Sequence, residues 1–156
     1  MVPKIQEMKG VLASNHGWTL LVESTSDKVK IETKRSIREL SMGRAVGPID
    51  WPAKDVMRCM MYGPLRREWD VNNDFMEHKK KIGVNAYVTY SKSLKKFVIS
   101  PRDFVVNYII NEDPDGTIMI CTSSDNCKLN IPDVSGIVRG YTALTGYTFK
   151  PDPSDP

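Results

Sequence analysis

Alternation of apolar and polar positions, the pattern of a strand with one wet face, recurs along most of the chain. In one example Val29 and Ile31 alternate with lysine and glutamate. Turn residues such as Pro114-Asp115-Gly116 separate several of these stretches. The pattern predicts strands over 18–24, 28–36, 37–46, 81–91, 97–110 and 117–124, with one or two more over 134–150.

Helical spacing interrupts the strands. A short helix is predicted over 3–13. The clearest helix has a single apolar stripe in which residues recur every three or four positions. Asp50 can cap this helix, Pro52 suits its first turn, and 64–69 adds another helical turn or two. The stripe, which we interpret as core packing, consists of Ala53, Val56, Met57, Met60 and Met61. The order of elements predicts an α+β chain dominated by one antiparallel sheet.

The segment FVISPRDFVVNYII (97–110) is apolar on both sides of Pro101-Arg102-Asp103. Proline cannot donate to a sheet ladder, so we expect a β-bulge at Pro101 that bends the strand. The adjacent charges would then each find a partner, since buried arginines are usually paired. A ligand contact by Arg102 is the alternative.

Composition and charge narrow the function classes. The chain has 156 residues, fits one domain and carries a formal net charge of +3. It contains no apolar run long enough to span a membrane and no secretory signal at its amino end. Three cysteines without C-x-x-C spacing predict reduced thiols and a cytoplasmic location. The basic stretches 77–81 and 92–96 lack interleaved aromatics, so they favour solvated strand ends or a lipid headgroup contact over nucleic acid.

No motif for catalysis or cofactor binding is present. The two histidines, His16 and His78, fall in different elements, and no phosphate-loop, dinucleotide or nucleophile-elbow motif occurs. A Ser/Cys–His arrangement could still assemble in space. We therefore expect no metal, no cofactor and no enzymatic activity.

Several motifs, in order, resemble those of the StAR-related lipid-transfer (START) domain family. They are GWTLLVES (17–24), DKVKIETKRS (27–36), LRREWD (65–70), ISPRDFVV (99–106), DGTIMICTSS (115–124) and SGIVRGY (135–141). The resemblance implies a helix-grip fold like that of Bet v1: a curved antiparallel sheet around a carboxy-terminal helix, enclosing a cavity for one lipid. It places the START-like domain at 1–150 and leaves 151–156 as a disordered tail.

The chain departs from the family pattern in two ways. The family runs on after V-R-G to two more strands and the gripping helix, and we expect this chain to stop before them, either as a fragment or with a partner chain supplying the cover. An open sheet edge would favour a homodimer or a domain swap. Sterol-binding members carry a carboxylate and an arginine where this chain has Ser91 and Tyr108. The resemblance therefore implies a neutral cavity lip with hydroxyl donors.

The cavity lining is where alternation and resemblance disagree. Alternation places the apolar face of 84–91 on Val84, Ala86, Val88 and Tyr90. The resemblance instead directs Tyr87, Thr89 and Ser91 toward the cavity. Following the resemblance, the predicted ligand-cavity residues are Tyr87, Thr89, Ser91, Arg102, Phe104, Val106, Tyr108, Ile118 and Ile120. The expected partner is a phospholipid, sterol or other hydrophobic ligand, with transient membrane contact. A regulatory interaction domain without a working pocket, or a cyclase- or hydrolase-like enzyme of this superfold, remains the alternative.

Overall fold

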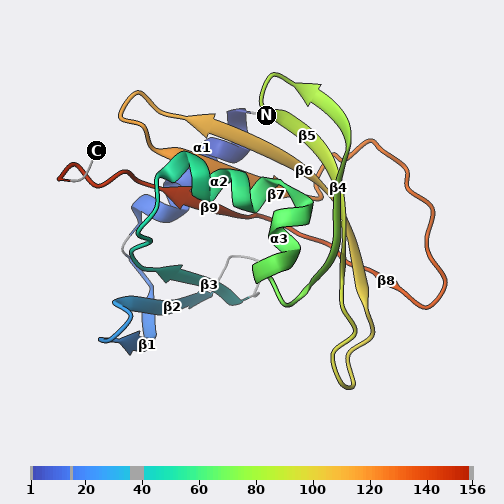
Figure 1. The fold of residues 1–156 in the computed structure, drawn as a ribbon, viewed down its shortest axis with the longest axis horizontal. Helices are drawn as coiled ribbons and strands as arrows, with labels where there is room; N and C mark the ends of the chain where they lie inside the picture. Colours follow the sequence, from blue (N-terminus) through green and yellow to red (C-terminus); the bar gives the residue numbers. More distant parts are fainter. Residues whose placement is uncertain (1, 15, 36–40, 155–156) are drawn as a thin grey trace. The chain divides into compact units, whose positions relative to one another are not determined.

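The structure, a computed structural model, describes residues 2–14, 16–35 and 41–154. It forms two compact units: a small unit, Gly10–Trp51, and a large unit made of Met1–Lys9 and Pro52–Pro156. The elements (Figure 1) are α1 Val2–Ala13, β1 Thr19–Ser24, β2 Val29–Arg35, β3 Ser41–Val46, α2 Ala53–Met61, α3 Gly63–Trp69, β4 Asn73–Gly83, β5 Ala86–Ser93, β6 Arg102–Glu112, β7 Ile118–Ser123, β8 Val138–Arg139 and β9 Thr145–Phe149.

The small unit is an antiparallel sheet in the order β1-β2-β3. The Trp18 indole donates to the carbonyl of Ser14 at 2.9 Å, and the guanidinium of Arg44 lies over its ring at 4.4 Å. The strands predicted over 18–24 and 28–36 are confirmed. Of the strand predicted over 37–46, the part from Ser41 is confirmed as β3, and 37–40 lies outside the described residues.

The large unit contains a sheet in the order β4-β5-β6-β7-β9, with β8 beside β6. The neighbours along this order pair antiparallel, and only β8 runs parallel to its partner. The pairing of β4 with β5 shifts register at three places, where β4 holds the extra residues Asp74, Lys79 and Ile82. Such bulges increase strand twist and bend, so they curve the sheet at β4.

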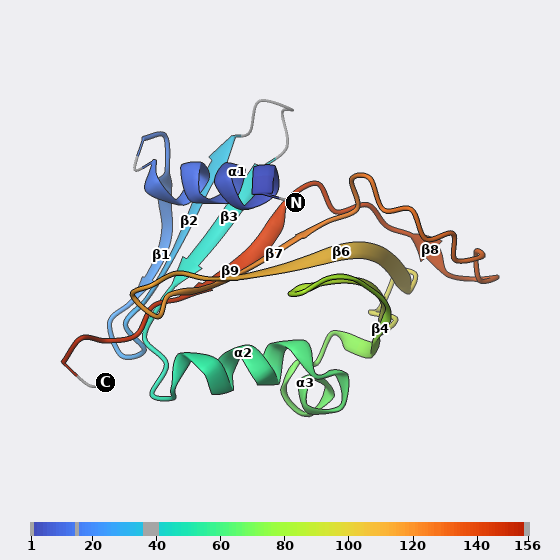
Figure 2. The same cartoon turned by 90° about the horizontal axis from the view of Figure 1, so that it is seen from above.

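Both faces of this sheet are covered. Figure 2 shows α2 and α3 on one side of β6, β7 and β9 and residues 2–9 of α1 on the other. We call the side facing α2 the inner face and the opposite side the outer face. On the outer face Val88, Tyr90 and Val105 pack against Cys127, Leu129 and Ile131. All six residues of β7 are consequently buried.

The strand limits around the β4–β5 and β5–β6 hairpins differ from the prediction. The strand predicted over 81–91 is divided by a turn at Val84-Asn85. The strand predicted over 97–110 begins only at Arg102 and runs to Glu112. The residues before it form the hairpin turn, because Lys96 and Ile99 exchange backbone hydrogen bonds at 3.2 and 2.7 Å.

The bulge predicted at Pro101 is wrong. Pairing between β5 and β6 is unbroken from Ala86–Ile109 to Lys92–Asp103. Pro101 lies just before the strand, a position where its missing N–H costs no ladder bond. Its carbonyl accepts the N–H of Val138 at 3.0 Å, so the proline marks where β8 joins β6.

The methionine stripe of α2 is confirmed as core packing, since Met60 and Met61 are buried. The predicted cap is wrong: Pro52 is the N-cap residue and no side chain caps this end. The carbonyl of Pro52 instead accepts the N–H groups of Asp55 and Val56 at 2.9 and 3.1 Å. Among the described residues no helix is both long and apolar enough to cross a membrane.

The Pro-Arg-Asp-Phe and Val-Arg-Gly motifs contact each other directly. Asp103 is 1% exposed and accepts hydrogen bonds from Arg139 at 2.7 and 3.1 Å and from the Tyr90 hydroxyl at 3.0 Å. The N–H of Gly140 donates to the carbonyl of Asp103 at 2.8 Å. A Cβ at Gly140 would overlap the ring of Phe104. The two motifs, 36 residues apart, therefore fit each other in both charge and shape.

Gly140→Ala is expected to lower the free energy of unfolding by about 1–3 kcal/mol, because the added methyl group displaces the Phe104 ring. Urea denaturation measures the change. Gly10→Ala is the control: a Cβ at Gly10 meets nothing within 4 Å, and alanine favours the helix that contains it. A Gly140→Ala protein as stable as the parent would contradict the close fit.

Candidate ligand-binding site

The inner face brings together eight of the nine predicted cavity residues. Residues opposite each other in an antiparallel pair point to the same side. Tyr87 pairs with Tyr108, Thr89 with Val106 and Ser91 with Phe104. Ile118 and Ile120 lie on this same face of β7, opposite Phe149 and Tyr147 of β9. The face chosen from the resemblance is thus the face that β5 turns toward α2.

The apolar residues selected by alternation are also buried, on the outer face. Ala86, Val88 and Tyr90 are buried, whereas Val84 is exposed in the β4–β5 turn. The two predictions disagreed because each assumed one buried face. In this sheet β5 is covered on both sides, so alternation could not identify the inner one.

Arg102 is not brought together with the other predicted residues. It is exposed, and its guanidinium donates to the carbonyl of Ser100 at 3.2 Å. Within the described part of the chain it reaches no acid, so the ion pair expected for it is not found there. Its neighbour Asp103 has the partner instead, because odd-numbered residues of β6 face the Arg139 side.

Methionines supply much of the apolar surface opposite the inner face. Met60 and Met61 of α2 and Met76 of β4 pack against Val106, Tyr108 and Ile120. Methionine is unbranched and polarizable, so such a cluster repacks around different shapes more easily than branched residues do. These side chains fill the space between α2 and the sheet.

A polar group sits at the border of this cluster. Arg66 of α3 donates to Asp70 at 3.0 Å and to the Tyr147 hydroxyl at 3.3 Å. Burial opposes its charge, but neighbouring Tyr108, Tyr147 and Asp70 hold the pKa of Arg66 above its ordinary value. Burial in turn raises the pKa of the Tyr108 hydroxyl. We call Arg66, Asp70, Tyr108 and Tyr147 the Arg66 cluster.

His78 adds a second polar position on the inner face. Its Nδ1 lies 2.8 Å from the Thr89 hydroxyl, and its ring stacks on Tyr87 with centroids 4.9 Å apart. Burial lowers the pKa of His78, against a hydrogen bond to the backbone of Met61 that raises it. The neutral ring is therefore the favoured form near neutral pH.

Sequence reasoning missed Arg66, Asp70, His78 and Tyr147. The first two belong to the LRREWD stretch, which served only as a family marker. The i, i+4 spacing of arginine and aspartate on one helical turn was the available signal. The neutral lip with hydroxyl donors stays a prediction, and beside Tyr108 lies an ion pair with side chains only 15% and 16% exposed.

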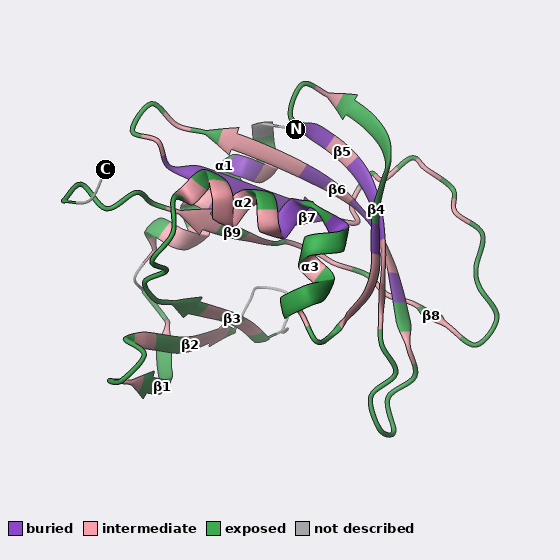
Figure 3. Cartoon of the chain, in the orientation of Figure 1, coloured by how far each residue is buried: buried purple, intermediate pink, exposed green. Residues whose placement is uncertain are grey.

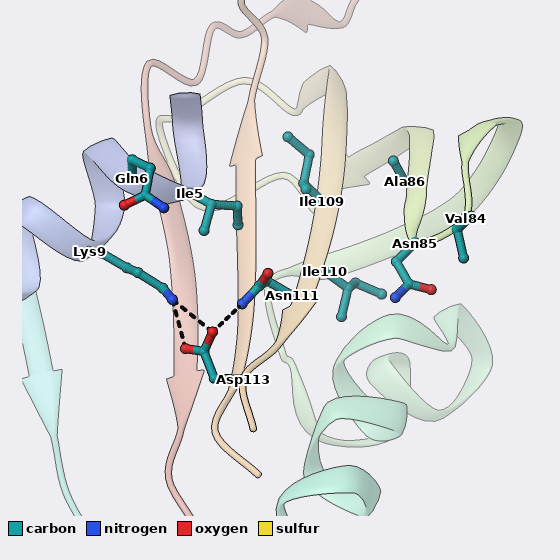
Figure 4. Close-up of a pocket in the computed structure, with 10 residues that line it drawn as sticks. All are labelled: Ile5, Gln6, Lys9, Val84, Asn85, Ala86, Ile109, Ile110, Asn111 and Asp113. Carbon is teal, nitrogen blue, oxygen red and sulfur yellow. Dashed lines mark hydrogen bonds and ion pairs between the residues drawn. The ribbon is translucent and has the colours of Figure 1, made fainter. Parts of the chain in front are cut away.

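A cleft of about 410 Å³ lies on the outer face, near α1 and the β4–β5 turn (Figure 4). Lys9 donates to both carboxylate oxygens of Asp113 at 2.8 Å, and Asn111 donates to the same group. A second cleft, of about 380 Å³, lies between α3 and β4 beside Gly63 and Arg67. Neither is lined by any predicted cavity residue. No group of three or more potential metal ligands occurs among the described residues.

Comparison with known proteins was made by sequence family and by structure. The family model of the START domain matches residues 4–156. Comparison with curated proteins found no match. Among solved structures, human StAR-related lipid transfer protein 5 is 25% identical, with a TM-score of 0.88 over 97% of this chain and 73% of its own.

Two other solved structures have the same fold. Human STARD10 is 20% identical, with a TM-score of 0.81 over 95% of this chain and 60% of its own. A StAR-related lipid transfer protein from Xanthomonas axonopodis is 22% identical, with a TM-score of 0.73 over 88% of this chain and 75% of its own. The motifs, the helix-grip fold and the family match agree, and the chain belongs to the START domain family.

Proposed function

We propose that the protein binds one lipid, without catalysis, between α2 and the inner face of the sheet. The observation that carries the proposal is the pairing of an apolar methionine cluster with the Arg66 cluster at its border. A lipid requires both kinds of surface, because its chains need apolar burial and its head needs polar partners. Family membership supports the same class of ligand.

In this proposal the lipid chains displace the methionine side chains. Burial contributes about 0.8 kcal/mol per CH₂, which compensates for repacking flexible side chains. Tyr87, Thr89, Ser91, Phe104, Val106, Ile118 and Ile120 would line the chains. Arg66, with the hydroxyls of Tyr108 and Tyr147, would hold an anionic or strongly accepting head group such as a phosphate.

The proposed compartment is the cytoplasm. Cys59, Cys121 and Cys127 are all free thiols, which is typical of proteins in a reducing environment. Burial beneath α1 raises the pKa of Cys121 to about 11, so that thiol stays protonated and unreactive.

Mass spectrometry of the purified protein tests the proposal directly. After incubation with phospholipid vesicles and re-isolation, the intact protein is expected to carry about one lipid per chain, identified in an organic extract. If no lipid is bound to the protein as purified, and none after incubation with vesicles, the proposal is wrong.

The filled space beneath α2 favours one second candidate, a START-fold interaction domain without a lipid pocket. Met60, Met61 and Met76 are buried against the inner face as the structure stands. A protein that never takes up lipid but binds a protein partner through the same fold would support that candidate.

A further inference from the structure

The two ends of α2 differ in how they are held on the sheet. Figure 2 shows the helix running from the end of the sheet near the β6–β7 turn to α3, beside β4. At the carboxyl end of α2, Met60 and Met61 are 7% and 9% exposed and belong to the methionine cluster. At the amino end, Ala53 and Val56 of the same apolar stripe are only half-buried. The stripe is therefore packed closely at one end of the helix and less closely at the other.

A hydrogen bond and a close backbone approach reinforce the carboxyl end. His78 of β4 forms a hydrogen bond to the backbone of Met61. Gly63, the first residue of α3, is buried, and a Cβ at this position would overlap the carbonyl oxygen of Met76 in β4. Because only glycine allows the two backbones to lie this close, the junction of α2 and α3 is fixed on that strand.

Few contacts hold the amino end. Pro52 is the N-cap residue, makes no side-chain cap and has no N–H of its own. Asp55 pairs with Arg58 of the same helix at 2.7 Å, so this contact does not tie α2 to the sheet. In the described part of the chain, the one ion pair from this end to the sheet joins Lys54 to Glu112 at 3.1 Å, with side chains 63% and 49% exposed. Water screens an ion pair as exposed as this, so it stabilises only weakly.

No regular structure precedes α2. Residues 47–52 are exposed and lie in neither helix nor strand (Figure 3). The carboxyl end instead continues through Tyr62 into α3, which packs against β4. A helix held firmly at one end and weakly at the other can move as a rigid body about the held end. The contacts of α2 thus place a hinge at residues 61–63.

We propose that α2 is a lid hinged at residues 61–63, and that its amino end lifts from the sheet to admit a lipid to the inner face. The inference rests on the proposed function, because it describes how the ligand reaches that site. Side chains fill the space between α2 and the inner face, so entry requires α2 to move. Lifting the amino end breaks one exposed ion pair and leaves the contacts of the carboxyl end with β4 in place.

Charge reversal at the amino end tests the lid. The rate of lipid uptake is measured with a fluorescent phosphatidylcholine that is self-quenched in donor vesicles and brightens when the protein extracts it. Lys54→Glu replaces attraction to Glu112 with repulsion and should speed uptake about two- to fivefold. Arg58→Glu is the matched control, because Arg58 is similarly exposed on α2 but pairs only within the helix. Its uptake rate should equal that of the parent.

A removable tether should give a larger effect. Lys54→Cys with Glu112→Cys, joined by a short bis-methanethiosulfonate linker, fixes the amino end, and uptake should fall about tenfold or more. Uptake should return when a reductant cleaves the linker, which shows that the tethered protein is folded. Arg67→Cys with Phe75→Cys places the same linker across the cleft between α3 and β4 and should leave uptake unchanged. Both pairs are built in a parent whose two half-buried thiols are replaced by serine.

The outcomes separate the lid from the proposed function. If the parent takes up lipid and the tether between positions 54 and 112 does not slow uptake, the lid is refuted. Equal losses from both tethers would also refute it, because α2 and α3 would then have to move together. A parent that takes up no lipid at all contradicts the proposed function itself, and the lid with it.

Discussion

Replacing Arg139 with leucine is expected to lower the free energy of unfolding by about 3–5 kcal/mol. The substitution leaves the carboxylate of Asp103, which is 1% exposed, without its cationic partner. The Tyr90 hydroxyl, still 3.0 Å away, cannot replace a two-bond contact with a guanidinium. Urea denaturation at neutral pH measures the loss.

Two companion variants make this result specific. Arg102→Leu, on the same motif, should change stability by no more than about 0.5 kcal/mol, because that side chain is exposed. Asp103→Leu combined with Arg139→Leu should recover part of the loss, since no charge is then stranded. If Arg102→Leu were the destabilising variant and Arg139→Leu neutral, the assignment of Arg139 as the stabilising partner of Asp103 would be wrong.

The Asp103–Arg139 pair also predicts how stability depends on pH. The hydrogen bond from Arg139 holds the pKa of Asp103 below its ordinary value of 3.8 in the folded protein. Its stabilisation is therefore present above pH 3.8 and is lost as pH falls through the folded-state pKa. In Arg139→Leu, burial without a cationic partner would instead raise the pKa of Asp103. The difference in free energy of unfolding between parent and variant should therefore decrease as the pH is lowered.

Replacing Arg66 with glutamine is expected to weaken binding of a fluorescent phosphatidylcholine by about tenfold or more. A hydrogen bond from a charged group to phosphate contributes roughly 1.5–3 kcal/mol, and glutamine removes the charge from the Arg66 cluster. Binding of a fluorescent long-chain alcohol, which has no phosphate, should be unchanged. Titration of each probe, with thermal denaturation to verify folding, measures both effects.

Arg67→Gln is the matched control for this binding prediction. Arg67 follows Arg66 on the same helix but is exposed and borders the cleft between α3 and β4. If lipid occupied that cleft, Arg67→Gln would weaken binding and Arg66→Gln would not. Equal affinity of the parent and both variants for both probes would mean that the Arg66 cluster takes no part in head-group binding.

The fold was predictable where the pattern repeats over several residues. The methionine stripe of α2 was found because five apolar residues share one helical face. The β5–β6 hairpin was misplaced because Phe97, Val98 and Ile99 read as strand residues, whereas they form the exposed turn. The β-propensity of a residue reflects how well it packs on a pleated, half-buried surface. It does not distinguish a strand from apolar residues at an exposed turn.

The candidate site was predictable only in its sheet. Side chains alternate between the two faces of a sheet, so once one residue of β6 is assigned to the inner face, the other inner residues of that strand follow. Arg66 and Tyr147 are 81 residues apart, and no spacing rule brings them together. Likewise the partner of Asp103 came from β8, a two-residue strand too short for periodicity to reveal.

The bulges of β4 have a consequence for self-association. A strand that could template another copy must offer regular, evenly spaced N–H and C=O groups along its free side. At one edge of the sheet β4 is irregular at three places and has an exposed, lysine-rich stretch, which disfavours any incoming strand. The other edge, β9, pairs with β7 without a shift over all five residues. Strand-by-strand growth of an assembly is therefore disfavoured at the β4 edge of this sheet.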